Sequence, residues 1–219
     1  MEKNINKFRM NKIKNIIFDL GGVILNLDVP RTINAFDALG IKNIVNDTGH
    51  HYQHSFFYDF EIGQISEDTF LQSLSNISKK SNSFKEIKQA WNLMILDIPK
   101  DRIDFLQNLK EDYNLFLLSN TNSIHQKKYL TEFNEKYKFS LNTLFKKSYY
   151  SHEIGIRKPD AEIFNFVLKD SSLIADETLF IDDAISNTKS AELCKLKSLL
   201  ITNNDIFETN RYLCKYLHF

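Results

Sequence analysis

The sequence has few of the residues that cross-link, break or bend a chain. Its 219 residues include 2 cysteines, 3 prolines and 6 glycines. Neither Cys194 nor Cys214 has a His or Cys partner at metal-ligand spacing, so we expect unpaired thiols rather than a disulfide or a metal site. No Pro/Gly-rich linker, low-complexity tract or internal repeat interrupts the chain. Its length therefore predicts one domain, or one domain with a modest insertion.

The sequence also lacks a charge excess of either sign and a long apolar run. The formal net charge is zero, which argues against nucleic acid or an anionic membrane as the main partner. No stretch approaches the roughly 18 apolar residues of a membrane-spanning helix. The polar, Lys-rich segment before residue 16 does not have the form of a signal peptide. We therefore expect a cytoplasmic protein with neither a nucleic-acid nor a membrane partner, and the sequence does not decide between a monomer and a homodimer.

What is present is enough apolar material for a packed core and a repeated alternation of strands and helices. Hydrophobic residues make up 42% of the chain, with 18 Phe and 9 Tyr. Short apolar runs at residues 16–18, 115–118, 178–181 and 198–201 predict buried strands. Helical patterns lie between them, including 159–168 with Pro159 in its first turn. This alternation predicts an α/β protein with a parallel sheet and helices on both faces.

A block after the first strand has a different character. Residues 30–97 show helical patterns and no convincing strand, which predicts a small all-α insertion. We therefore expect a core built from residues 10–29 and 98–219, a helical cap over 30–97, and a loose tail over 1–9.

The first strand ends on a carboxylate followed by two glycines. Asp19 comes directly after the apolar run 16–18, and ligands of open α/β sheets bind beyond the carboxyl ends of the strands. Gly21 and Gly22 allow the backbone to turn sharply close to a bound group. On this stretch alone, a plain strand and Asp-Gly turn is an equally good interpretation.

The ends of two later strands change that balance. Ser119 and Asn120 follow one strand, Asp182 and Asp183 end another, and Lys158 lies in the loop before a helix. Clustered carboxylates suit a hard cation, and Mg²⁺ takes one or two carboxylates plus a phosphate. Ser119, the amides after it and Lys158 supply donors for phosphate oxygens. A carboxylate nucleophile beside Mg²⁺ and Lys is a chemically sensible site for phosphoryl transfer.

These segments resemble the four motifs of the haloacid dehalogenase superfamily, whose core is Rossmann-like. The resemblance covers essentially residues 12–205. The matching segments are 18–23, 117–120, 157–159 and 180–183 with Asn187 four residues on. The block 30–97 resembles the cap domain of the superfamily.

The resemblance implies a role for each matching residue. Asp19 would be the nucleophile that becomes an aspartyl phosphate. Mg²⁺ would be held by Asp183, the Asp19 carboxylate and the Gly21 carbonyl, with Asp182 at or next to the metal. The remaining implied roles are phosphate binding by Ser119, Asn120 and Lys158, and loop orientation by Asn187. The implied activity is a Mg²⁺-dependent phosphatase for a small-molecule phosphomonoester.

One departure from the superfamily pattern concerns proton transfer. Its phosphatases usually carry a second Asp two residues after the nucleophile, as general acid and base, where this chain has Gly21. Loss of a general acid costs roughly 10²–10⁴ in rate, and a leaving group of low pKa feels that loss least. The sequence also resembles the glucose-1-phosphatase-like subgroup, close to the phosphatase domain of epoxide hydrolases, so a sugar phosphate such as glucose 1-phosphate is the favoured substrate. The alternatives are a weakly active or non-catalytic phosphate-binding protein and, less favoured, a 2-haloacid dehalogenase.

Several other polar residues invite a functional interpretation. Asp28, past the glycine turn, is a candidate replacement acid, although a role at the hinge or in anchoring the cap is the better expectation. His125 is a weaker candidate, with helix-end hydrogen bonding as the simpler explanation. The cluster of His50, His51 and His54 lacks a convincing carboxylate or Cys partner, so we expect a polar cap surface there.

Overall fold

The core of the protein is a parallel five-stranded sheet. The structure, a computed structural model, describes residues 13–45 and 52–217, so the expected tail, His50 and His51 lie outside it. The strand order is β3-β2-β1-β4-β5, and every neighbouring pair is parallel. The strands are β1 (Asn15–Phe18), β2 (Asn114–Ser119), β3 (Lys147–Tyr150), β4 (Thr178–Asp182) and β5 (Lys197–Leu200). The predicted α/β class is confirmed.

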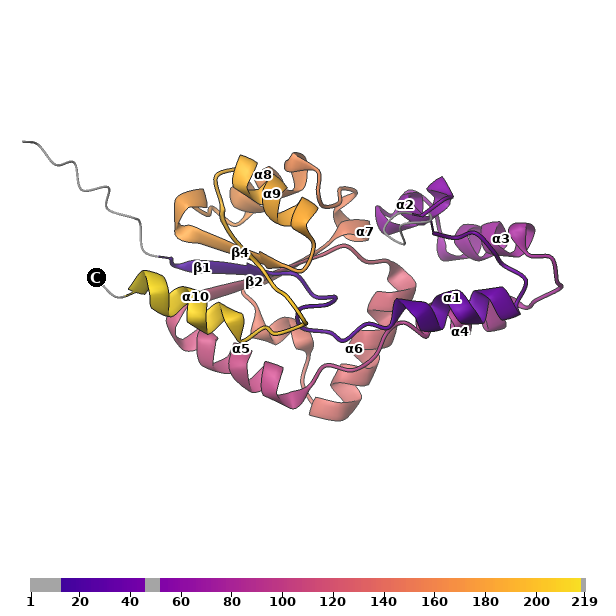
Figure 1. The fold of residues 1–219 in the computed structure, drawn as a ribbon, viewed down its shortest axis with the longest axis horizontal. Coiled ribbons are helices and arrows are strands. Elements are labelled where there is room, and N and C mark those ends of the chain that lie inside the picture. The colour runs from indigo at the N-terminus through magenta and orange to yellow at the C-terminus, as the bar shows by residue number, and fades with distance from the viewer. Residues whose placement is uncertain (1–12, 46–51, 218–219) are drawn as a thin grey trace, which may run out of the picture.

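Helices cover both faces of this sheet (Figure 1). On one side lie α5 (Lys100–Asp112), α6 (Ser123–Tyr137) and α10 (Glu208–Leu217), and on the other lie α8 (Ala161–Asp170) and α9 (Ile185–Leu193). Shorter elements are α7 (Ser151–Ile154), η1 (Leu141–Leu144) and η2 (Ala175–Glu177). Successive side chains of a strand point to opposite faces, so Phe18 enters the larger apolar cluster and Ile17 the smaller one. No helix in the described ranges is both long and apolar enough to cross a bilayer.

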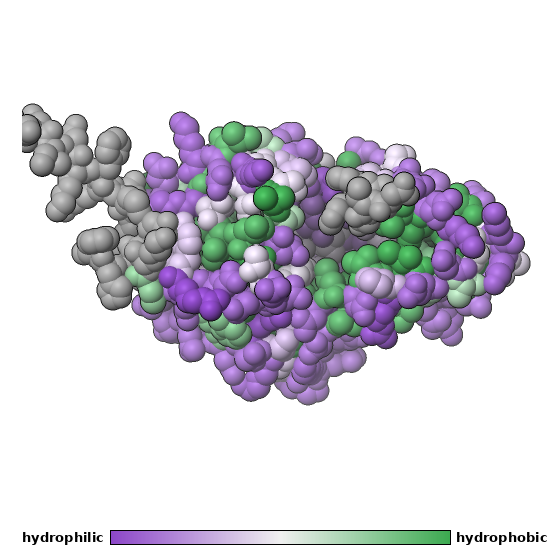
Figure 2. Space-filling view, in the orientation of Figure 1, coloured by the Kyte–Doolittle hydropathy of each residue, from purple (hydrophilic) through white to green (hydrophobic). Residues whose placement is uncertain are grey.

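Four helices between β1 and β2 form a block to one side of the sheet (Figure 1). They are α1 (Val29–Ala38), α2 (Ser55–Glu61), α3 (Glu67–Ile77) and α4 (Phe84–Asn92). We call them the helical block. Phe57, Phe70 and Trp91 are buried at its centre with their rings about 5.5 Å apart. Figure 2 shows apolar residues gathered where the block adjoins the sheet half of the molecule.

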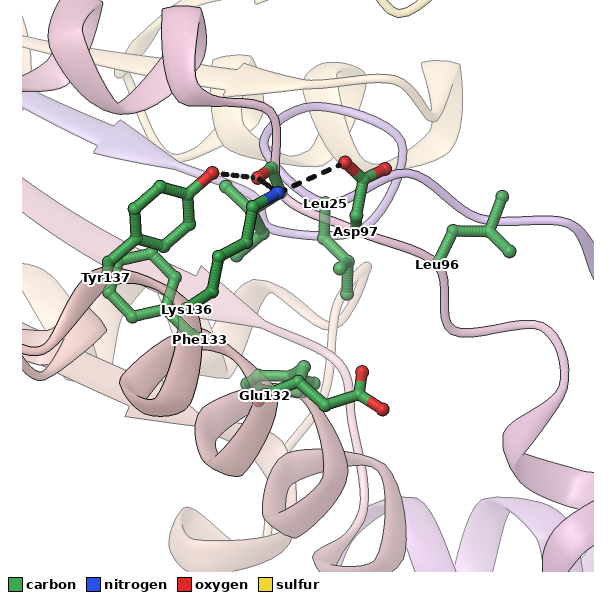
Figure 3. Close-up of a pocket in the computed structure, with 9 residues that line it drawn as sticks. Leu25, Leu96, Asp97, Glu132, Phe133, Lys136 and Tyr137 are labelled. Carbon is green, nitrogen blue, oxygen red and sulfur yellow. Dashed lines mark hydrogen bonds and ion pairs between the residues drawn. The ribbon is translucent and has the colours of Figure 1, made fainter.

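The two segments that join the block to the sheet run side by side. Asn26 N donates to Asp97 O at 2.9 Å, Leu96 N donates back to Asn26 O at 3.1 Å, and Asp28 N donates to Met94 O at 2.9 Å. Helix α6 anchors the returning segment, because the Tyr137 hydroxyl donates to Ile98 O at 2.7 Å (Figure 3). A cavity of about 60 Å³ lies beneath this anchor. The block is therefore joined to the sheet by a hinge of two hydrogen-bonded segments of the chain.

Two local predictions differ from the structure. The helix expected from Pro159 begins at Ala161, because residues 157–160 form a turn closed by Asp160 N and Arg157 O at 3.1 Å. Helix α2 was not expected, and its 7 residues are too few to show a helical period in the sequence.

Candidate active site

Asp19 stands at the carboxyl end of the central strand. Its backbone N–H donates to Ile181 O at 2.8 Å, which continues the pairing of β1 with β4 by one residue beyond the strand. The residue is 8% exposed. Because the flanking strands end at the same edge, side chains from their ends converge on this carboxylate.

Lys158 joins two of the carboxylates that converge there. Its Nζ donates to Asp19 Oδ1 at 2.7 Å and to Asp182 Oδ2 at 2.6 Å, and the residue is 1% exposed. Two anionic partners offset the cost of burying the ammonium. The Asn120 side chain holds the Lys158 backbone, accepting from its N–H at 2.9 Å and donating to its carbonyl at 2.8 Å. In this structure the Asn120 carboxamide therefore contacts the lysine loop, and phosphate binding by Asn120 stays a prediction.

Asp182 is enclosed by donors. Its Oδ1 accepts from Ala184 N at 2.8 Å, and Asn187 Nδ2 lies 3.0 Å from both carboxylate oxygens. Together with Lys158, these donors use most of the acceptor capacity of Asp182. The neighbouring Asp183 is exposed, so its carboxylate is the more open of the two.

The three carboxylates fit a divalent cation. One oxygen each from Asp19, Asp182 and Asp183 lies within 4.8 Å of the others. Burial raises the pKa of Asp19 to about 7; Lys158 opposes this shift, while the charges of Asp182 and Asp183 add to it. Burial and the charge of Asp182 also raise the pKa of Asp183. A hard cation with oxygen ligands would relieve this repulsion, so the donor set suits Mg²⁺.

Gly21 and Gly22 each lie against a different side chain that a Cβ would meet. Gly22 has a φ of 75°, and a Cβ there would lie 2.0 Å from Asp183 Oδ2, so only glycine lets this carboxylate approach. A Cβ on Gly21 would lie 2.8 Å from Leu27 Cδ1. The space next to Gly21 is thus occupied by an apolar side chain, where superfamily phosphatases usually carry an acid.

A cavity of about 190 Å³ lies beside Gly21, between the helical block and the sheet. Ser119, which is 2% exposed at the end of β2, and Asn120 line it from the sheet side. Tyr52 and Glu61 line it from the block. The cavity is smaller than the 300–1,000 Å³ typical of drug-sized pockets, which indicates a small ligand.

The sequence analysis did not identify Glu61, and it included Arg157 only as part of the matching segment 157–159. Glu61, the last residue of α2, has Oε2 3.0 Å from Arg157 Nε. Arg157 directly precedes Lys158 and lies 4.7 Å from the centre of the Tyr58 ring. The only signal for Glu61 in the sequence was an acid directly after the aromatic-rich segment 56–60, which by itself is typical of a helix end.

The two candidate acids outside the carboxylate cluster make other contacts in the structure. The Asp28 carboxylate accepts from Arg31 N at 3.4 Å as the N-cap of α1, at the hinge. His125 lines the cavity, but both ring nitrogens are occupied, by Asn122 Nδ2 at 3.2 Å and Trp91 O at 3.0 Å. Burial lowers the pKa of His125 to about 4, so its ring is neutral at pH 7.

The histidine cluster has only one described member. His54 precedes α2 and stacks on Phe56 with 5.3 Å between ring centres. It belongs to no group of three metal-ligating side chains within residues 13–45 and 52–214.

Comparison with known proteins agrees with this geometry. The family model of haloacid dehalogenase-like hydrolases matches residues 13–194. A curated D-ribitol-5-phosphate phosphatase of Bacteroides thetaiotaomicron is 36% identical over 176 residues, which are 80% of this chain and 85% of the relative.

Two solved structures have the same fold along nearly the whole chain. A mutant of a haloacid dehalogenase family enzyme of Bacteroides thetaiotaomicron, in complex with magnesium and inorganic phosphate, is 34% identical and has a TM-score of 0.85 over 91% of this chain and 98% of its own. A hydrolase of the same predicted family from Porphyromonas gingivalis is 31% identical and has a TM-score of 0.82 over 93% of this chain and 98% of its own.

Proposed function

Since the chain belongs to the haloacid dehalogenase-like hydrolases, we propose that it hydrolyses a small sugar or polyol phosphate through a phosphorylated Asp19. It is an enzyme of the phosphoric monoester hydrolase class, and its cofactor is Mg²⁺. The observation that carries the proposal is the cluster of Asp19, Lys158 and two further carboxylates, which opens beside a small cavity. We also propose that the helical block is the cap that encloses the substrate.

The proposed reaction has two steps. An Asp19 carboxylate oxygen attacks phosphorus, the bond from phosphorus to the substrate oxygen breaks, and that oxygen takes a proton from solvent water and leaves as an alcohol. Water then attacks the phosphorus of the aspartyl phosphate, loses a proton, and releases inorganic phosphate and the Asp19 carboxylate. Asp19, Asp183 and the Gly21 carbonyl would hold Mg²⁺, which would neutralise charge on the phosphate oxygens.

The remaining residues would bind the phosphate or hold other residues of the site in position. Lys158 and Ser119 would contact the phosphate, and the Asn120 side chain would keep Lys158 in place through its two backbone bonds. Asp182 would orient the Lys158 ammonium, while Asn187 holds Asp182. Gly21 supplies no proton, and the neutral His125 ring is fully engaged.

Two substrates are the leading candidates and differ in their leaving groups. The anomeric oxygen of glucose 1-phosphate has a low pKa and needs an acid least, which the absence of an acid at Gly21 favours. The leaving group of D-ribitol 5-phosphate is a primary alcohol, ribitol. This substrate is supported by the relative at 36% identity.

The test is Mg²⁺-dependent phosphate release from a panel of phosphomonoesters. The panel contains D-ribitol 5-phosphate, glucose 1-phosphate, glucose 6-phosphate, a nucleotide and an aryl phosphate, with Asp19→Asn as the blank. We expect turnover that Asp19→Asn abolishes, with ribitol 5-phosphate or glucose 1-phosphate preferred. Mg²⁺ and phosphate binding without any turnover would instead favour the non-catalytic alternative. Halide release from a 2-haloacid without metal would favour a dehalogenase.

A further inference from the structure

The cavity beside Gly21 has one charged side chain on its wall, among the residues that the structure describes. Glu61 is that side chain, and the helical block supplies it. Much of the remaining wall is apolar and is formed by Leu20, Leu25, Leu27, Val29, Met94 and Ile95. A carboxylate in such a wall needs hydrogen-bond donors, and its two oxygens can accept more than one bond.

Among the described residues, Arg157 is the charged partner of Glu61. Glu61 Oε2 is shielded from solvent and lies 3.0 Å from Arg157 Nε, so Arg157 supplies one charged partner and the two carboxylate oxygens have room for further donors. The Glu61 side chain is 13% exposed. Buried carboxylates ordinarily accept hydrogen bonds, so this one retains acceptor capacity at the edge of the cavity.

Contacts with the sheet half of the molecule hold Glu61 in position. Ser151 Oγ donates to the Glu61 carbonyl at 2.6 Å. Gly63 has a φ of 68°, and a Cβ there would lie 2.2 Å from His152 O, so the chain after α2 packs directly against α7. Arg157 holds the carboxylate from the loop that also carries Lys158. The acceptor therefore has a defined place relative to Lys158.

We propose that Glu61 is a specificity-determining residue that accepts hydrogen bonds from hydroxyl groups of the substrate. The inference rests on the proposed function, because a phosphate held at Asp19 and Ser119 directs its organic group into this cavity. A carboxylate is an acceptor only, so it favours a polyol chain over an alkyl chain of equal length.

The test compares three phosphomonoesters in the full-length, Mg²⁺-loaded enzyme. Ribitol 5-phosphate carries hydroxyls and a poor leaving group, pentyl phosphate has the same carbon chain without hydroxyls, and an aryl phosphate has a good leaving group. In Glu61→Gln and Glu61→Leu we expect kcat/KM for ribitol 5-phosphate to fall by roughly 10–100-fold, mainly through KM, as fits the loss of hydrogen bonds to a charged group. The other two esters should change less than about threefold.

A matched control is Glu67→Gln, which removes a charge from α3 in the same helical block, where Glu67 pairs with Lys88. It should leave all three rates unchanged, and thermal melting checks that each variant is folded.

Each other pattern overturns the inference in a distinct way. Equal losses on ribitol 5-phosphate and pentyl phosphate, with the aryl phosphate spared, would make Glu61 a proton donor to the leaving oxygen. Equal losses on all three esters would make its role structural. If the unaltered enzyme hydrolyses neither these three esters nor glucose 1-phosphate, the proposed function itself fails and the inference fails with it.

Discussion

The ammonium nitrogen of Lys158 lies 2.7 Å from Oδ1 of Asp19, and the lysine side chain is 1% exposed. This contact lowers the pKa of Asp19, while burial, the largest influence, raises it. Lys158 thus favours the ionised form of Asp19, the proposed nucleophile, and places a positive charge beside the proposed phosphate site. The loop that carries Lys158 reaches the edge of the sheet where β1 ends, and this brings the ammonium to Asp19.

Replacing Lys158 by Met should therefore reduce both reactivity and anion binding. We expect kcat/KM for an aryl phosphate to fall by roughly 10²–10³-fold in Lys158→Met, as when one preorganised donor is removed. Phosphate binding, measured by calorimetry in the presence of Mg²⁺, should weaken as well. Lys189→Met, at an exposed position of α9, is the control and should behave like the unaltered enzyme. Activity of Lys158→Met within a few fold of normal would contradict the role of this pair.

The second glycine after Asp19 offers a test of the metal site that does not rely on turnover. Gly22→Ala should weaken Mg²⁺ binding, because the new Cβ would lie 2.0 Å from Asp183 Oδ2 and push that carboxylate away. Gly155→Ala is a matched control, since Gly155 has a similar φ of 80° but nothing within 4 Å of its Cβ position. Both variants lose conformational freedom of the backbone, and only Gly22→Ala should lose affinity for Mg²⁺ in a calorimetric titration. Equal Mg²⁺ affinities in the two variants would argue against Asp183 as a ligand.

The missing acid at Gly21 can be restored only if its space is cleared. Gly21→Asp alone should lower the melting temperature, because its Cβ would lie 2.8 Å from Leu27 Cδ1. The double variant Gly21→Asp/Leu27→Ala makes room, and we expect its rate on an alkyl phosphate to exceed that of Gly21→Ala/Leu27→Ala by up to roughly 100-fold. An aryl phosphate should show little gain, because it needs no acid. No gain on the alkyl ester would indicate that another group already transfers the proton.

The neutral His125 predicts a loss of stability in mild acid. Burial lowers its pKa from 6.5 to about 4. Below about pH 6.5 the His125 side chain is protonated in the unfolded chain but stays neutral in the folded chain. The free energy of unfolding therefore decreases as the pH falls to about 4. The contribution is on the order of 3 kcal/mol. In urea titrations at pH 7 and 4.5, His125→Gln should lose less stability between the two pH values than the unaltered protein does. His54→Gln is the control, and an undiminished pH dependence in His125→Gln would contradict the assignment.

Much of the fold could be predicted because its signals are local. The runs 16–18, 115–118 and 178–181 are apolar and short, which is typical of strands buried on both faces, and β1, β2 and β4 formed there. The helix expected from Pro159 was misplaced because its start depends on a turn between residues 157 and 160. The end of a helix is decided by neighbours in space as well as in sequence.

The convergence of Asp19 and Asp182 illustrates what the sequence by itself determined about this protein. Both residues end predicted parallel strands, and parallel strands end on the same side of a sheet, so one anionic edge could be predicted. Lys158 lies in a loop, and only the tertiary structure brings its ammonium to the two carboxylates. Only the tertiary structure decided that Leu27 fills the space beside Gly21, that Asn120 holds the lysine loop, and that Glu61 enters the cavity from the helical block. Those relationships join segments that are far apart in the chain or depend on the side-chain packing around a turn. No local pattern of residues can specify them.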